Sequence, residues 1–358
     1  MENAWKKYAG NLDPVMNFGK DYIDFMTLSK TERETVDNSI EIAEKAGFKD
    51  LNTVSELKAG DKVYFNNRGK SLFLFVVGKE DLAKGLNILG AHVDSPRLDL
   101  KQNPLYEDSG LVLLDTHYYG GIKKYQWVAQ PLALHGVVCK KDGSLVKVVI
   151  GENDDDPVVG VSDLLIHLAA DQMKKTGSNV VEGEDLNVLF GSIPAATEED
   201  EKELVKKNIL NLLKEKYDIE EDDFISAEIE VVPAGKARDY GFDRSMVMAY
   251  GQDDNVCAYT SLRAIVEEEN PERTSCCILS DKEEVGSQGN TGMHSSAFEN
   301  TLAELMDKCG QYSELNIRRC LRNSMMLSSD VSAAHDPNYP SVSSPNQNNA
   351  EFGKGIVF

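Results

Sequence analysis

In the first ninety residues, stretches with apolar positions at helical spacing alternate with short apolar stretches of strand length. Residues 29–48 have apolar positions at helical spacing after a capping box, in which Thr31 precedes Glu34 by three positions, and the pattern stops at Gly47. Two predominantly apolar stretches of strand length then follow, over 71–78 and 86–94. Helices alternating with buried strands predict an α/β fold for this part of the chain.

The pattern changes after Pro96. It predicts strands joined by turns that contain glycine, over residues 109–121, 131–151 and 227–235. Helices are also expected in this stretch, over 161–173 and within the acidic segment 196–223.

From about residue 240 the α/β pattern returns. Helices are predicted over 254–270 and 295–310, with strands over 245–251, 274–281 and 324–332. The simplest account is one α/β domain, formed by residues 1–96 and 239–358, that is interrupted by a β-rich insertion over 97–238.

The charge, the hydropathy and the cysteines of the sequence exclude several classes of protein. The 38 Lys and Arg residues against 60 Asp and Glu give 358 residues a net charge of −22, which disfavours partners such as nucleic acid or an anionic membrane. The segment "MENAWKKYAGNLD" has no apolar run of signal-peptide length, and no later stretch is long enough to span a membrane. Six cysteines without a C-x-x-C pair indicate free thiols. We therefore expect a cytoplasmic protein.

Acidic residues and one histidine end four of the predicted strands. Ligands of open α/β sheets bind beyond the carboxyl ends of the strands, so these positions are the candidate site. The residues are His92 and Asp94 after the first strand, Asp253 and Asp254 after the second, Asp281, Glu283 and Glu284 after the third, and Asp330 after the fourth.

Each terminus also has an ordinary structural explanation. Asp253 and Asp254 precede a helix and are good N-cap residues. Glu283 and Glu284 can be a solvated acidic pair, and Asp330 can form a turn. However, so many carboxylates at one sheet edge would repel one another unless divalent cations were bound between them. One histidine with several carboxylates suits zinc, cobalt or manganese.

Four motifs together resemble the M18 family of dinuclear zinc aminopeptidases, the aspartyl aminopeptidase family. They are "GAHVDSPRLDLK", "QDDNVCAYTSL", "SDKEEVGSQGNTG" and "SSDVSAAHDPNYP". The resemblance extends through nearly the whole chain. It implies a mixed-sheet, three-layer α/β/α metallopeptidase domain with an inserted β-rich oligomerisation domain, two zinc ions (with cobalt or manganese as alternatives) and peptide substrates.

The resemblance also implies a role for individual residues. His92 and Asp330 match ligands of one metal ion, and Glu284 matches a ligand of the other. Asp253 matches the carboxylate that bridges both ions, and it is chosen over Asp254 because the family's bridging Asp is followed by Asp or Asn. The resemblance further implies a cis peptide bond between these two residues.

Three more residues complete the inferred site. Glu283 matches the general base, and Asp94 matches the carboxylate that orients the histidine ligand. His167, within 161–173, matches a histidine that reaches the active site of a neighbouring subunit, in dimers that assemble into a dodecamer-like shell. His117, His135, His294 and His335 are expected in ordinary surface or turn positions. In the family, about a hundred further residues carry the second terminal histidine ligand and part of the substrate pocket.

Other classes of protein fit less well. The chain has no G-x-x-x-x-G-K-[ST] or G-x-G-x-x-G phosphate-binding motif and no G-x-S-x-G nucleophile elbow. The alternative that stays open is a non-catalytic oligomeric scaffold or cargo protein of the M18 type. The name of the family suggests removal of N-terminal Asp or Glu.

Overall fold

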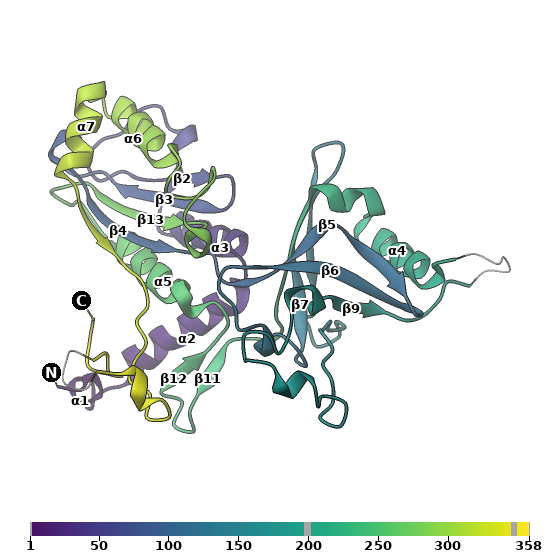
Figure 1. The fold of residues 1–358 in the computed structure, drawn as a ribbon. Helices are drawn as coiled ribbons and strands as arrows, with labels where there is room; N and C mark the ends of the chain where they lie inside the picture. The colour runs from purple at the N-terminus through teal and green to yellow at the C-terminus, as the bar shows by residue number, and fades with distance from the viewer. Residues whose placement is uncertain (1, 197–201, 345–348, 358) are drawn as a thin grey trace.

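The computed structural model describes residues 2–196, 202–344 and 349–357, in which two six-stranded sheets lie side by side (Figure 1). The first sheet has the order β1-β2-β3-β13-β4-β14. Its strands are β1 (Lys49–Asp50), β2 (Lys62–Asn67), β3 (Ser71–Val76), β4 (Asn87–His92), β13 (Ser275–Ser280) and β14 (Met325–Ser328). β13, β4 and β14 run parallel and β3 is antiparallel to β13, so the sheet is mixed, as predicted.

Helices cover both faces of the first sheet (Figure 1). On β3, Leu72 and Leu74 face one core and Phe73 and Phe75 face the other, because successive side chains of a strand point to opposite faces. One core includes α2 (Asp13–Leu28), α3 (Glu32–Lys45) and α5 (Gln252–Glu267), and the other includes α6 (Ala297–Lys308) and α7 (Glu314–Asn323). The short helix α1 (Ala4–Lys7) lies near the N-terminus. The three-layer α/β/α arrangement is therefore confirmed.

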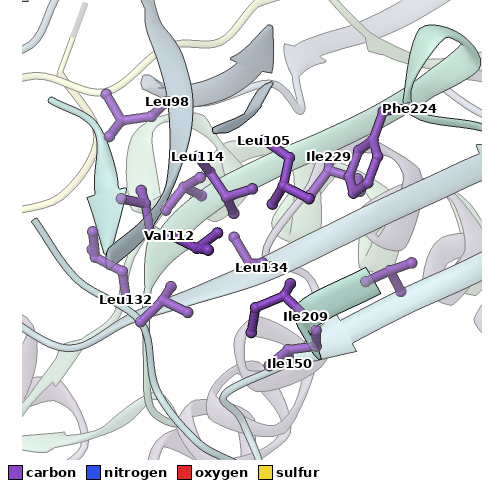
Figure 2. Packing of buried hydrophobic residues seen from close by; sticks show 14 of the residues in the cluster. Leu98, Leu105, Val112, Leu114, Leu132, Leu134, Ile150, Ile209, Phe224 and Ile229 are labelled. Carbon is purple, nitrogen blue, oxygen red and sulfur yellow. The ribbon is translucent and has the colours of Figure 1, made fainter. Parts of the chain in front are cut away.

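The second sheet is antiparallel and has the order β8-β7-β10-β5-β6-β9. Its strands are β5 (Arg97–Asp108), β6 (Leu111–Tyr119), β7 (Leu132–Cys139), β8 (Leu145–Ile150), β9 (Val188–Gly191) and β10 (Ala227–Pro233). The helix α4 (Leu204–Tyr217) packs on it, and Figure 2 shows side chains such as Leu114, Leu134 and Ile209 in their shared core. α4 lies within the acidic segment 196–223, of which residues 197–201 are outside the described ranges.

Two predicted elements differ from the structure. The helix that the apolar spacing predicts over 161–173 does not form; the chain instead makes turns and the short 3₁₀ helix Gln172–Lys174. Several apolar side chains here, including Leu165, Ile166 and Leu168, are exposed. Most helices in proteins are stabilised by packing an apolar face, and this segment has no such packing within the described chain.

The strand predicted over 245–251 is also not part of the main sheet. It is shortened to β12 (Met246–Met248) and pairs with β11 (Arg238–Tyr240) in a separate two-stranded ribbon. Asp253 therefore does not follow a strand of the first sheet. It lies instead in the first turn of α5, which packs against β4.

Buried ion pairs join the second sheet to α3, which packs on the first sheet. Arg97 Nε lies 2.8 Å from Asp99 Oδ1 and 3.2 Å from Glu230 Oε2, and its Nη1 lies 3.5 Å from Glu32 Oε2 on α3. Burial and the negative charge of Glu32 raise the pKa of Glu230 well above its usual value. Burial also raises the pKa of Glu32, but the positive charges of Arg97 and Lys70 lower it by more, so the pKa of Glu32 is below its usual value. These opposite shifts favour one charged carboxylate and one protonated carboxyl beside the guanidinium.

A buried histidine lies at the same junction. On β7, His135 Nδ1 lies 3.0 Å from Glu34 Oε1 and its Nε2 lies 3.0 Å from Glu152 Oε1. The expected surface position for His135 is therefore wrong, since the residue is buried. Burial by itself lowers the pKa of His135, but the hydrogen bonds to Glu152 and Glu34 raise it more.

We expect the His135→Gln variant to lose free energy of unfolding mainly at low pH. Because the folded-state pKa is raised, the charged ring contributes stability in full below its unfolded-state pKa of about 6.5. That contribution is lost as the pH rises through the folded-state pKa. Urea denaturation from about pH 6 to pH 9 should therefore show the variant approaching the wild type as the pH rises. A difference that stays constant with pH, or an equal effect of His117→Gln at an exposed position, would contradict the assignment.

Candidate metal centre

The site lies where three parallel strands of the first sheet end. β4 ends at His92, β13 is followed by Asp281, and β14 is followed by Asp330. β4 lies between the other two strands, so His92 is at the middle of this edge. The prediction that polar residues gather at the carboxyl ends of the strands is correct for these three strands.

His92 is buried and held by one ring nitrogen. Its Nδ1 lies 3.0 Å from the backbone oxygen of Asp94 and 3.3 Å from Asp94 Oδ1. Its Nε2 lies 3.3 Å from Asp253 Oδ1 and 3.8 Å from Glu283 Oε2. Burial lowers the pKa of His92, but the hydrogen bond to Asp94 and its negative charge raise it more, to about 9, so Nε2 carries a hydrogen toward the carboxylates when no cation is bound. With Nδ1 held by Asp94, a metal ion would take the place of the Nε2 hydrogen.

Asp94 is fully buried and accepts several hydrogen bonds. The backbone N–H groups of Glu283 and Glu284 donate to its carboxylate at 3.1 and 3.2 Å, and the Tyr119 hydroxyl donates at 2.7 Å. Burial raises the pKa of Asp94, but hydrogen bonds from His92 and Tyr119 lower it more, so the net pKa is below the usual value. Asp94 is therefore a carboxylate that connects the histidine to the Glu283–Glu284 segment.

Asp253 and Asp254 differ sharply in position. The peptide bond between them is cis, as the resemblance implies. The Asp253 carboxylate is half-exposed and faces His92 Nε2, whereas Asp254 is fully buried and burial raises its pKa to about 6. Gly251, with φ +76°, precedes the pair, and a Cβ there would lie 3.1 Å from Ser95 Oγ, which donates to the Asp253 carbonyl. Glycine thus lets the chain pass close to Ser95.

Glu283 and Glu284 lie in a short 3₁₀ helix, Glu283–Val285, just after β13. Burial raises the pKa of Glu284 to about 7, and the negative charges of Asp253, Asp94 and Glu283 contribute to the same direction. Mutual repulsion of this kind is what a bound cation would relieve.

The four predicted ligands and the predicted general base, Glu283, meet in two sets. His92, Asp253 and Asp330 each place one potential ligand atom within 4.8 Å of the others, and so do His92, Glu283 and Glu284. One imidazole with hard carboxylate oxygens fits zinc, cobalt or manganese, and the directed Nε2 of His92 supports that fit. The structure thus brings together five of the seven predicted site residues in these two sets, with Asp94 directly behind them.

Two outcomes were not predicted by the sequence pattern. His167 is exposed in the loop after Val161 and belongs to neither set. Tyr119, which has no predicted role, donates to Asp94 from the second sheet. The only local signal is the "HYYGG" stretch at the end of a predicted strand, which by itself does not indicate a site.

An open α/β sheet whose strand ends carry a directed histidine and clustered carboxylates defines a metal-dependent hydrolase. Comparison with known proteins is consistent with that class. The sequence model of the family described as "Aminopeptidase I zinc metalloprotease (M18)" matches residues 25–358. The chain belongs to the M18 family of metallo-aminopeptidases, which hydrolyse peptide bonds.

Individual relatives give the same result. The chain is 60% identical over 362 aligned positions to the protein named Probable M18 family aminopeptidase 1 of Clostridium acetobutylicum. The alignment covers 100% of this chain and 77% of that relative. The crystal structure of an M18 family aminopeptidase from Thermotoga maritima matches with a TM-score of 0.93 at 43% identity, over 99% of this chain and 77% of that one. Aminopeptidase I from C. acetobutylicum matches with a TM-score of 0.89 at 57% identity, with the same coverage.

Proposed function

We propose that this chain is a two-metal aminopeptidase that releases single residues from the N-termini of peptides. The observation that carries the proposal is the convergence of His92 with Asp253, Asp330, Glu283 and Glu284 in two sets of potential ligand atoms. His92 and Asp330 would bind one ion, Glu284 would bind the other, and Asp253 would bridge them. Zinc is the proposed metal, with cobalt or manganese as alternatives.

The side chains divide the chemistry between them. When bound, the two ions would polarise the scissile carbonyl and lower the pKa of the attacking water to about 7. Glu283, half-exposed and 3.8 Å from His92 Nε2, is placed to take the proton of that water and to pass it to the leaving amine. Asp94 keeps the imidazole of His92 in its metal-binding tautomer. The proposed substrate preference is N-terminal Asp or Glu.

We further propose that residues 97–238 form a dimerisation domain, that residues 1–96 and 239–358 form the catalytic domain, and that dimers assemble into a shell of the dodecamer type. The exposed apolar side chains of Leu165, Ile166 and Leu168 beside His167 support an interface at this loop. The yeast protein mApe1, which has the same fold at 21% identity and a TM-score of 0.73, is a dodecamer. In such an assembly His167 would enter the neighbouring subunit's active site.

The proposed location is the cytoplasm. All six cysteines, which lie within the described residues, are unpaired, as expected of a reducing compartment. A search of the described residues for a helix able to span a membrane finds none. The net charge of −22 disfavours nucleic acid as a partner.

One experiment separates the proposed enzyme from a non-catalytic scaffold. The purified protein is loaded with zinc, cobalt or manganese and is assayed with Asp, Glu, Leu and Lys aminoacyl p-nitroanilides, while light scattering of the same sample reports its assembly. We expect hydrolysis that is lost on chelation, returns on adding metal, and is fastest with Asp or Glu. An assembled, metal-loaded protein that hydrolyses none of the substrates would favour the scaffold. A monomer at micromolar concentration would contradict the role of His167.

A further inference from the structure

The second sheet reaches into the metal centre through the end of β6. Tyr119 is the last residue of this strand and is buried, and its hydroxyl donates to Asp94 Oδ2 at 2.7 Å. Its ring lies 3.8 Å from the guanidinium carbon of Arg97, so the aromatic face is stacked on a buried cation. Gly120 follows with φ +70°, and a Cβ at this position would lie only 3.2 Å from Glu284 Cβ.

Asp94 contacts both His92 and the Glu283–Glu284 segment, and so fixes the position of one relative to the other. Its Oδ1 accepts from the Glu283 N–H and lies 3.3 Å from His92 Nδ1, whereas its Oδ2 accepts from both the Glu284 N–H and the Tyr119 hydroxyl. Three of these partners belong to the first sheet and its loops, and Tyr119 alone comes from the second sheet. Without the Tyr119 hydroxyl, the Asp94 carboxylate would be held only by His92 and by the backbone of Glu283 and Glu284, which belong to the metal site themselves. Its orientation would then be fixed less firmly.

We propose that Tyr119 is a positioning residue of the metal centre. It fixes the Asp94 carboxylate, and through Asp94 it sets the orientation of His92 and of the Glu283–Glu284 backbone. The close approach of Gly120 to Glu284 places the residue after β6 against the same Glu283–Glu284 segment. This inference rests on the proposed function, because it assigns Tyr119 a role only if His92 and Glu284 bind metal.

The test is a cobalt titration that requires no substrate. Competition with a coloured chelator gives the affinity of the purified protein for cobalt, and the visible absorption spectrum of bound cobalt reports the geometry of its ligands. Tyr119→Phe removes the hydroxyl but keeps the ring on Arg97. We expect it to bind cobalt roughly 10- to 100-fold more weakly, with a changed spectrum, as is typical when a group that orients a ligand is lost. Removing a donor to a buried carboxylate should also lower the melting temperature of the metal-free protein, and this loss of stability is measured separately from the cobalt affinity and spectrum.

A matched control and a double variant make the outcomes distinct. Tyr118→Phe removes the hydroxyl of the half-exposed neighbouring residue and should behave like the wild type. In an Asp94→Ala background, Tyr119→Phe should cause no further loss of affinity, because the two residues act as one unit. The role of Tyr119 would be wrong if Tyr119→Phe had the same cobalt affinity and spectrum as Tyr118→Phe. It would also be wrong if Tyr119→Phe caused its full loss of affinity in the Asp94→Ala background. Either result would leave the proposed function in place. The proposed function predicts that the wild type binds cobalt and that His92→Ala loses this binding. If either result fails, the proposed function and this inference are both wrong.

Discussion

The Glu283→Gln variant should bind metal as the wild type does and lose about 10²- to 10⁴-fold in kcat, the usual cost of removing a general base. The amide keeps the size of the carboxylate but cannot accept the proton of the attacking water. The backbone of residue 283 should stay in place, because its N–H still donates to Asp94. Metal content, measured on the same sample as the rate of p-nitroanilide hydrolysis, separates a lost base from a lost ligand.

The matched control for Glu283 is Glu304→Gln, at an exposed position on α6. Its rate and metal content should be those of the wild type. Near-normal turnover of Glu283→Gln would remove Glu283 from the chemistry. A loss of bound metal in proportion to the loss of rate would instead make Glu283 a ligand, as its place in one of the two ligand sets allows.

The largest effect on stability is expected for Arg97→Met, at about 3–5 kcal/mol of the free energy of unfolding. The substitution removes the cation between Glu32 and Glu230; Glu32 then keeps its ion pair with Lys70 at 2.9 Å, while Glu230 stays buried beside it. Removing one partner of a buried ionic group costs more than the group contributes when complete, because the remaining charge stays desolvated. Denaturation in urea at neutral pH measures the difference.

An exposed ion pair provides the comparison. Lys79 and Glu272 lie 2.6 Å apart with most of both side chains exposed, so Lys79→Met should cost less than about 1 kcal/mol. Replacing Arg97, Glu32 and Glu230 together by apolar residues should recover much of the loss, since Lys70 would still pair with Glu228 at 3.0 Å. Equal costs for Arg97→Met and Lys79→Met would show that the buried cluster is not what holds the junction.

Local sequence patterns were sufficient for most of the first sheet and for three strand ends of the site. The continuous apolar run before His92 reflects a strand covered on both faces. Thr31 caps α3 as predicted, with its hydroxyl accepting from the Glu34 N–H, but the Glu34 carboxylate accepts from the Lys30 N–H in place of the reciprocal bond, so only half of the capping box forms. The choice of Asp253 over Asp254 came from family resemblance, and the structure places Asp253 at His92 with Asp254 buried behind it. A local pattern alone could not have separated two adjacent aspartates.

The features that were missed depend on contacts between distant parts of the chain. Tyr119 meets Asp94, and His135 meets Glu34, across the junction of the two sheets, and neither pairing leaves a local signal. The ribbon that contains β12 was assigned to the main sheet because a short apolar strand does not specify its partner. In the segment 161–173 the apolar residues have helical spacing, but most of them, such as Leu165, Ile166 and Leu168, are exposed and gain no packing from the described part of the chain that would make a helix stable.

The chain enters the second sheet through β5 and leaves it through β10, and these two strands are neighbours, with Leu98 opposite Val231. A protein segment whose ends lie side by side can be accommodated in a surface loop without separating the strands on either side of that loop. This is the geometry in which whole domains are gained, lost or exchanged during evolution. β5 begins shortly after the strand that ends at His92, so a change in the second sheet can alter the surroundings of the proposed catalytic residues while β4 and β13 remain paired. Such an arrangement would allow the second sheet to change in sequence while the first sheet stays the same, provided that contacts between them such as Tyr119–Asp94 and His135–Glu34 are kept.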